Sequence, residues 1–141
     1  YAHTPNGLEV VLKEAKFLSR YQNGKVITVF GCGGDRDRKK RPIMGRIAEK
    51  FSDSIVITQD NPRTEEMGQI VTDILAGVKG KNYTVIHDRY SAIKTAIEQA
   101  QPNDIIMIVG KGHETIQIIG TEHIPFSDKS VALELLKQNE S

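Results

Sequence analysis

Short apolar runs alternate along this chain with longer segments in which apolar residues recur every three or four positions. The runs at 26–30, 55–58, 83–86 and 105–109 are nearly continuous in apolar and β-branched residues, which is typical of strands buried on both faces. The helical periodicity predicts helices over about 6–20, 42–51, 65–77, 90–100 and 128–137. Strands that alternate with helices indicate an α/β fold with an open, mostly parallel sheet flanked by helices.

The segment from residue 115 to residue 125 breaks this alternation. It contains two short runs joined at Gly120-Thr121, which predicts an antiparallel hairpin at an edge of the sheet. Ser127 and Asp128 follow, where the predicted helix at 128–137 needs a capping residue. A length of 141 residues is sufficient for a core, and we expect residues 1–141 to form one domain.

The composition argues against several classes of partner. Nineteen basic and eighteen acidic residues leave a formal net charge of +1, so the chain lacks the general positive field that drives non-specific binding to nucleic acid. No apolar stretch approaches the roughly 18 residues of a membrane span, and we expect neither nucleic acid nor membrane as a partner. A single cysteine, Cys32, excludes an internal disulfide and favours a reducing compartment. The chain begins at Tyr1 rather than Met, and we expect it to be a piece of a longer protein.

Polar residues are concentrated where the predicted strands end, which is where ligands bind in an open parallel sheet. The strand at 55–58 is followed by the turn Asp60-Asn61-Pro62-Arg63. An Arg guanidinium binds a carboxylate through two parallel hydrogen bonds, and an Asp carboxylate accepts from an ammonium group. The turn is therefore a candidate site for a zwitterionic amino acid. Asn-Pro is also a common turn former without any ligand, and this alternative stays open.

Two further strand ends combine glycine with charged residues. The first strand is followed by Gly31-Cys32-Gly33-Gly34 and a basic run from Arg36 to Arg41, and the fourth by Gly110-Lys111-Gly112-His113-Glu114. Glycine-rich turns expose main-chain amides that can bind an anion at a helix start, and Pro42 is well tolerated in a first helical turn. We interpret the basic run as a solvated loop rather than a nucleic-acid patch, because no aromatic residue is interleaved with it. A local anion site remains open.

A dinucleotide-binding site is the first competing interpretation. Gly31 and Gly33 begin the glycine fingerprint, and Asp60 is a candidate acid for a ribose. However, Arg36 stands where the fingerprint needs its third glycine, which disfavours this interpretation.

Other catalytic motifs are incomplete. His113-Glu114 lacks the second histidine of a zinc-peptidase helix, because Gln117 takes its position. Cys32 is expected to be a small packed residue rather than a nucleophile. No phosphate-binding loop Gly-x-x-x-x-Gly-Lys-Ser/Thr occurs. We therefore expect the chain alone to bind no ATP, Mg²⁺ or other metal and to catalyse no reaction.

Four motifs taken together identify a resemblance to a known family. They are Tyr1-Ala2-His3-Thr4-Pro5; Gly31-Cys32-Gly33-Gly34-Asp35-Arg36-Asp37 with Lys40-Arg41-Pro42; Asp60-Asn61-Pro62-Arg63 with Thr64-Glu65-Glu66; and Gly110-Lys111-Gly112-His113-Glu114 with Gln117. In this order and spacing they closely resemble the C-terminal domain of the Mur ligases, and within that family the ligases that add meso-diaminopimelate. The resemblance runs from the first residue to the last predicted helix.

The resemblance implies an ATP-dependent amide-bond ligase of peptidoglycan synthesis in the bacterial cytoplasm. An amino-terminal domain would take UDP-N-acetylmuramoyl-L-alanyl-D-glutamate and a central domain would hold ATP and Mg²⁺, and we expect both to lie outside this chain. Residues 1–141 would be the Rossmann-like domain that binds the incoming amino acid. In this family ATP phosphorylates the D-glutamate carboxyl group, and the amine of the amino acid attacks the acyl phosphate.

Matching positions also imply a set of site residues. The residues expected around meso-diaminopimelate are Arg36, Asp60, Asn61, Pro62, Arg63, Gly110 and Glu114, and those expected on the nucleotide side are Tyr1 and His3. The two arginines would bind carboxylates, while the two acids would accept from ammonium groups. Lysine has no distal carboxylate, so a buried Arg63 would lose its partner at a cost of about 1–3 kcal/mol.

Two other functions stay open at this point. One is a related Mur-type ligase that uses L-lysine or another amino acid, and the other is a stand-alone amino-acid-binding module. A phosphate loop encoded upstream of Tyr1 would support a ligase, whereas a start codon directly before it would support the module.

Overall fold

The four apolar runs are strands of one parallel sheet in the computed structural model, which describes residues 4–33, 37–59, 64–109, 116–119 and 122–125. The strands are β1 (Val26–Phe30), β2 (Ser54–Ile57), β3 (Tyr83–Val85) and β4 (Ile105–Ile108). The helices are α1 (Pro5–Tyr21), α2 (Lys40–Phe51), α3 (Met67–Leu75) and α4 (Arg89–Gln99). The first four predicted helices are thus confirmed, with ends shifted by one or two residues. The fifth, at 128–137, and its caps Ser127 and Asp128 lie outside the described residues.

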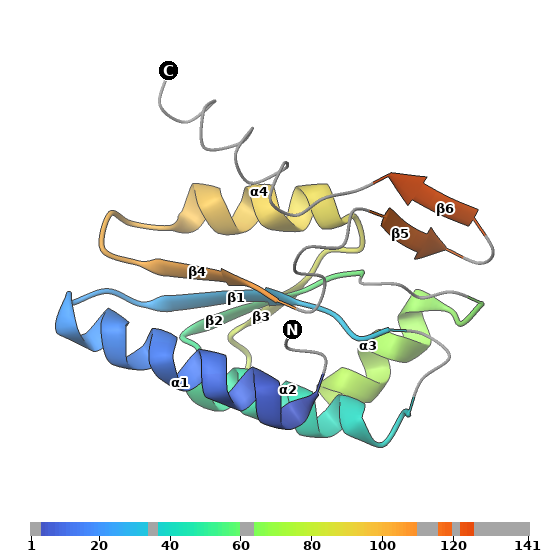
Figure 1. The fold of residues 1–141 in the computed structure, drawn as a ribbon, viewed down its shortest axis with the longest axis horizontal. Helices are drawn as coiled ribbons and strands as arrows, with labels where there is room; N and C mark the ends of the chain where they lie inside the picture. Colours follow the sequence, from blue (N-terminus) through green and yellow to red (C-terminus); the bar gives the residue numbers. More distant parts are fainter. Residues whose placement is uncertain (1–3, 34–36, 60–63, 110–115, 120–121, 126–141) are drawn as a thin grey trace.

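The order of the strands across the sheet is β3-β2-β1-β4, and every neighbouring pair is parallel. From β1 the chain moves outward through β2 to β3, and then returns to the other side of β1 as β4 (Figure 1). The strand order therefore reverses between β1 and β4. In open α/β sheets this topological switch point, at the carboxyl ends of the strands, is where ligands bind.

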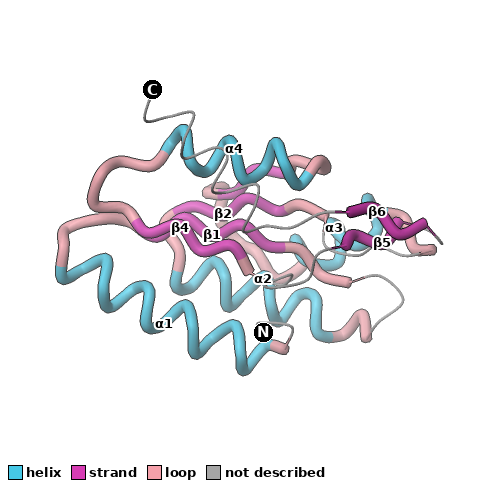
Figure 2. Tube along the Cα trace, turned by 45° about the horizontal axis from the view of Figure 1, so that its top comes forward, coloured by secondary structure: helices cyan, strands magenta, loops and turns pink. Residues whose placement is uncertain are grey.

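Helices cover both faces of the sheet. The first three helices lie on one face and α4 lies on the other (Figures 1 and 2). Successive residues of a strand point to opposite faces, so Phe30, Ile55 and Ile57 pack with α1, α2 and α3, whereas Val29 and Val56 pack with α4. All five residues of β1 are buried, as expected for a central strand between two helical layers.

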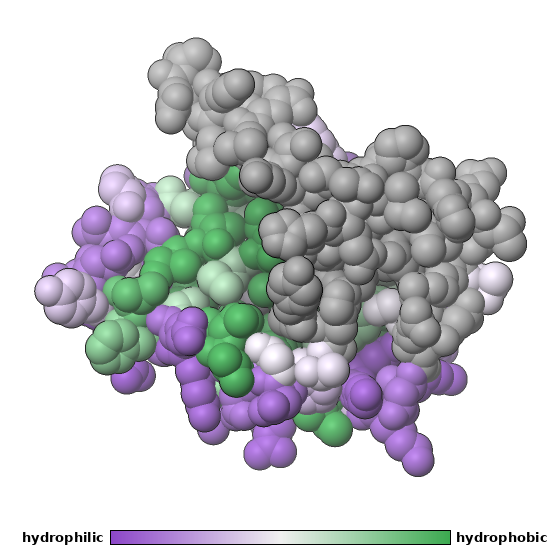
Figure 3. All heavy atoms as spheres, in the orientation of Figure 1, coloured by the Kyte–Doolittle hydropathy of each residue, from purple (hydrophilic) through white to green (hydrophobic). Residues whose placement is uncertain are grey.

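The layer formed by α1 and α2 differs in surface character from the open edge of the sheet. Hydrophilic side chains line the exposed sides of α1 and α2 in Figure 3. The edge strand β4 is half-buried along its whole length, and hydrophobic residues gather where it reaches the surface (Figure 3).

The predicted antiparallel hairpin is present as β5 (Ile116–Ile119) and β6 (Glu122–Pro125). These two strands pair with each other and form a two-stranded sheet of their own. The hairpin lies beyond the carboxyl ends of the parallel strands in both ribbon views, instead of extending the sheet beside β4 (Figures 1 and 2).

Two glycines, Gly45 in α2 and Gly77 just after α3, allow the main chains of the two helices to approach each other closely. A Cβ atom on Gly45 would overlap the carbonyl oxygen of Ile74, and one on Gly77 would overlap the carbonyl oxygen of Pro42. Since the obstructing atoms belong to the main chain, a larger residue can be accommodated only if a helix shifts. This contact fixes the first turn of α2 against α3.

We expect Gly45→Ala to lower the free energy of unfolding by about 1–3 kcal/mol, because the added methyl group meets main-chain atoms of α3. Urea unfolding of the chain measures this difference. Gly68→Ala is the matched control, since beyond its chain neighbours and the main chain of its own helix no atom lies within 4 Å of its Cβ position. The control should be neutral or stabilise by up to about 1 kcal/mol. Equal effects of the two substitutions would contradict the proposed helix contact.

Candidate functional site

The carboxyl ends of three strands meet at one edge of the sheet. Phe30 of β1 is in register with Ile57 of β2, and Val29 of β1 is in register with Ile108 of β4. The pairing extends one step further, because the amides of Thr58 and Val109 donate to carbonyls of β1 at 3.0 Å. The loops that follow β1, β2 and β4 therefore start side by side at the switch point.

All the site residues predicted from the sequence lie outside the described part of the chain. Those after the three strands are Arg36, Asp60, Asn61, Pro62, Arg63, Gly110 and Glu114, and those at the start of the chain are Tyr1 and His3. The structure describes the residues that anchor the strand-end segments, namely Gly33, Gln59, Glu65 and Val109. Two buried arginines connect these anchors.

Arg89 joins the end of β2 to the end of β4. It is the first residue of α4, whose N-cap Asp88 accepts a hydrogen bond from the Ser91 amide at 3.0 Å. The Arg89 side chain is buried, and it donates to the main-chain carbonyls of Gln59 at 2.6 Å and Val109 at 3.3 Å. Since these carbonyls immediately precede Asp60 and Gly110, one guanidinium holds the starting points of two predicted ligand-binding segments.

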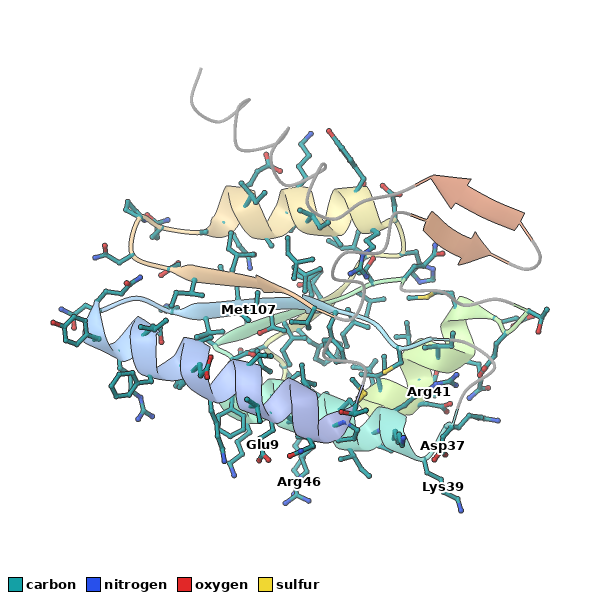
Figure 4. All side chains as sticks on the ribbon, in the orientation of Figure 1. Glu9, Asp37, Lys39, Arg41, Arg46 and Met107 are labelled. Carbon is teal, nitrogen blue, oxygen red and sulfur yellow. The ribbon has the colours of Figure 1, made fainter. Side chains whose placement is uncertain are left out.

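Arg41 joins the loop after β1 to the residues after the Asp60–Arg63 turn. Its guanidinium is buried in the first turn of α2 and donates to the Gly33 carbonyl at 3.0 Å. It also binds both carboxylate oxygens of Glu65, at 2.5 and 2.7 Å, in the bidentate geometry that suits a planar fork. Figure 4 shows Arg41 between α2 and α3.

Asp73 of α3 completes a charge cluster around Arg41. It accepts from Arg41 at 2.8 Å and from the exposed Arg38 at 2.9 and 3.2 Å. Gln69, one turn earlier in the same helix, donates to the same carboxylate at 2.9 Å. The two arginines balance the charges of Glu65 and Asp73, so the cluster has no net charge.

The electrostatics of this cluster follow from its hydrogen bonds. The Arg38 side chain, followed by Arg41 and Gln69, holds the pKa of Asp73 well below its ordinary range, against the opposing effect of burial. The Glu65 carboxylate raises the pKa of Arg41 further above its already high ordinary value. Asp73 and Arg41 therefore stay charged at neutral pH, and the ion pairs of the cluster remain formed.

The interpretation of the basic run from Arg36 to Arg41 as a solvated loop is wrong for Arg41. The side chains of Arg38, Lys39 and Lys40 are exposed, but Arg41 is 1% exposed. A signal for this was available in the sequence: Arg41, Met44, Gly45 and Ala48 form the buried stripe of α2 at helical spacing. An arginine on such a stripe needs acidic partners, and these come from α3 and the residues just before it.

Other candidate chemistry finds little support in the described residues. Cys32 is buried, with its sulfur 3.8 Å from that of Met44, which confirms it as a packed residue. Within the described ranges, no three His, Cys, Asp or Glu side chains come together as a metal site. No helix in that part of the chain is long and apolar enough to cross a membrane.

One groove of about 320 Å³ lies away from the switch point. It is lined by Lys13, Lys16, Phe17, Arg20, Lys50 and Phe51 from the C-terminal halves of α1 and α2. These helix ends lead into β1 and β2, which places the groove toward the amino ends of the strands. It contains none of the predicted site residues.

The strand order, the switch point and the anchored loops define an α/β domain of the kind that binds a ligand at its carboxyl edge. Residues 1–112 match the family model described as "Mur ligase, glutamate ligase domain". The chain therefore belongs to the Mur ligase family.

Its relatives are diaminopimelate ligases. The chain is 54% identical over 140 residues to the UDP-N-acetylmuramoyl-L-alanyl-D-glutamate–2,6-diaminopimelate ligase of Clostridioides difficile, covering 98% of this chain and 28% of that protein. It is 52% identical over 138 residues to the ligase of the same name from Haemophilus influenzae, covering 97% and 28%. A solved structure of a ligase of this name matches with a TM-score of 0.92 and 43% identity over 100% of this chain and 29% of that one. The chain thus spans less than a third of the length of each of these proteins.

The charge cluster predicts a specific loss of stability in acid. The pKa of Asp73 is lowered by folding, so its contribution to stability is fully present above its unfolded pKa of about 3.9 and is lost as pH falls through the folded value. We expect Asp73→Asn to cost about 1–3 kcal/mol at pH 7, and the difference from the unsubstituted chain to shrink below about pH 4. Urea unfolding of both chains between about pH 7 and about pH 2.5, a range that includes the titration of ordinary carboxyl groups, measures this difference.

Asp37→Asn is the matched control, because Asp37 is exposed and lies outside the cluster. It should change the free energy of unfolding by no more than about 0.5 kcal/mol. A constant difference between Asp73→Asn and the unsubstituted chain across the whole pH range would show that the ion pairs do not contribute as described.

Proposed function

We propose that this chain is the C-terminal, amino-acid-binding domain of an ATP-dependent ligase that adds meso-diaminopimelate to UDP-N-acetylmuramoyl-L-alanyl-D-glutamate. The observation that carries the proposal is the convergence of three strand ends at the switch point. Arg41 and Arg89 bind residues that flank the three segments in which the diaminopimelate contacts are predicted. The names of the relatives support the same substrates.

The predicted contacts suit the chemistry of the amino acid. Meso-diaminopimelate carries a carboxylate and an amino group at each end of its chain. Arg36 and Arg63 supply planar guanidinium groups for the carboxylates, and Asp60 and Glu114 supply acceptors for ammonium groups. Gly110 would let a ligand approach the main chain closely, and Pro62 would stiffen the turn, so that less entropy is lost on binding.

In this proposal the domain binds and orients the nucleophile of the reaction. Its two arginines and two acids would fix both ends of the amino acid, so that one amino group faces the acyl phosphate formed on the D-glutamate carboxyl group. Orienting two reactants in this way removes much of the entropic barrier to their reaction.

The nucleotide belongs mainly to the rest of the complete enzyme. In this proposal ATP and Mg²⁺ are held by an amino-terminal portion of the complete protein, which would carry the phosphate loop that the present sequence lacks. Tyr1 and His3 would lie on the nucleotide side. The chain alone would then show no turnover, and the complete enzyme would act in the bacterial cytoplasm.

We expect Arg63→Ala in the complete ligase to raise the KM for meso-diaminopimelate by about 10- to 100-fold, because a charge-assisted bidentate pair is lost. The KM values for ATP and for the UDP-dipeptide should stay within about twofold, since the proposal assigns Arg63 to the amino acid alone. Phosphate release with each substrate varied in turn measures all three constants.

Arg46→Ala is the matched control, because Arg46 is exposed on α2 and projects away from the rest of the chain (Figure 4). Comparing meso-diaminopimelate with L-lysine in the unsubstituted enzyme tests the substrate itself. A preference for lysine would favour the related ligase, whereas a start codon directly before Tyr1 would favour a stand-alone binding module. An unchanged KM in Arg63→Ala would remove the proposed role of the turn.

A further inference from the structure

We propose that Arg41 is a positioning residue for amino-acid recognition, whose guanidinium fixes Gly33 relative to Glu65, the two residues that flank the segments carrying Arg36 and Arg63. The inference rests on the proposed function, because those two arginines are the predicted carboxylate-binding groups. Arg41 itself is buried in the first turn of α2, and it contacts the main chain of Gly33 and the side chain of Glu65.

The contacts of Arg41 reach both segments at once. Its Nη2 atom donates to the Gly33 carbonyl at 3.0 Å and to Glu65 Oε1 at 2.7 Å, so a single nitrogen joins the two loops. Gly33 precedes Arg36 by three residues, and Glu65 follows Arg63 by two. The two anchors that Arg41 joins are therefore close in sequence to the two recognition arginines.

The remaining contacts prevent Arg41 from turning away. Its Nη1 atom donates to Glu65 Oε2 and to Asp73 Oδ2 at 2.8 Å, and Asp73 belongs to α3. The α2–α3 contact at Gly45 and Gly77 places this helix against the first turn of α2. The guanidinium is thus fixed from α3, and the two loops are fixed to the guanidinium.

Only arginine among the basic residues can make this set of contacts. A lysine ammonium has three donors on one nitrogen and cannot present two parallel hydrogen bonds to Glu65 while also reaching Gly33 and Asp73. Arg41→Lys therefore keeps the charge and removes the bridge. Glu65→Gln removes the bidentate pair from the opposite side and keeps the shape of the side chain.

A merely structural role for Arg41 would affect all substrates alike, whereas a positioning role would affect recognition of the distal carboxylate. The quantity to measure is therefore the ratio of kcat/KM for meso-diaminopimelate to that for L-lysine, in the complete ligase at saturating ATP and UDP-dipeptide. A displacement of the two arginines by about 1 Å is expected to lower this ratio by about 10- to 100-fold in both variants. The KM for ATP should stay within about twofold, and Arg46→Ala should leave the ratio unchanged.

The possible results separate the two proposals. A ratio near one in the unsubstituted enzyme overturns the proposed function and this inference with it. A strong preference for meso-diaminopimelate that persists in Arg41→Lys and Glu65→Gln leaves the proposed function standing and shows that Arg41 is structural. If Arg41→Lys does not fold, as judged by urea unfolding, Glu65→Gln decides the question, because Glu65 is partly exposed and its amide analogue retains the packing.

Discussion

The parallel register of β1, β2 and β4 is the constraint on which the candidate site depends. Because these strands are paired residue by residue and end together, their loops must leave from the same edge. The reversal of strand order then places the loops after β1 and β4 on neighbouring strands, with the loop after β2 beside them. Helices do not contribute to this arrangement directly, but α2 and α4 supply the arginines that hold it.

Burying those arginines is costly unless their partners are complete. A guanidinium removed from water without a partner costs several kcal/mol, and a buried ion pair often contributes little net stability even when well formed. The two terminal nitrogens of Arg41 meet this requirement with two carboxylates and one carbonyl, while its Nε has no hydrogen-bond partner among the described residues. The first turn of α2 is set against α3 by glycines that allow no side chain between them. Such a cluster is best understood as a means of fixing loop geometry, with modest net stabilisation.

Much of the fold followed from the sequence because strands and helices leave local patterns. The apolar runs and the helical spacing identified four strands and four helices, and the resemblance to the Mur ligases agreed with the family found by comparison. The strand order did not follow from periodicity, since pairing joins residues far apart in the chain. Arg41 was misassigned for the same reason: its neighbours in sequence are exposed basic residues, but its acidic partners lie 24 and 32 positions away.

Arg89 shows a different limit of sequence analysis. Its partners are main-chain carbonyls, and every residue type carries such a group, so no pattern of side chains marks the contact. The predicted contacts with diaminopimelate rest on motif matching, and they remain predictions, because these residues lie outside the described ranges.

The use of carbonyl acceptors at Gly33, Gln59 and Val109 has an evolutionary consequence. A substitution at any of these three positions alters a side chain but leaves the acceptor oxygen in the chain. The residues that follow them can therefore diversify without dismantling the frame that presents them. Proteins with this architecture can acquire new amino-acid specificities by substitutions within the loops, while Arg41 and Arg89 continue to bind the same main-chain carbonyls.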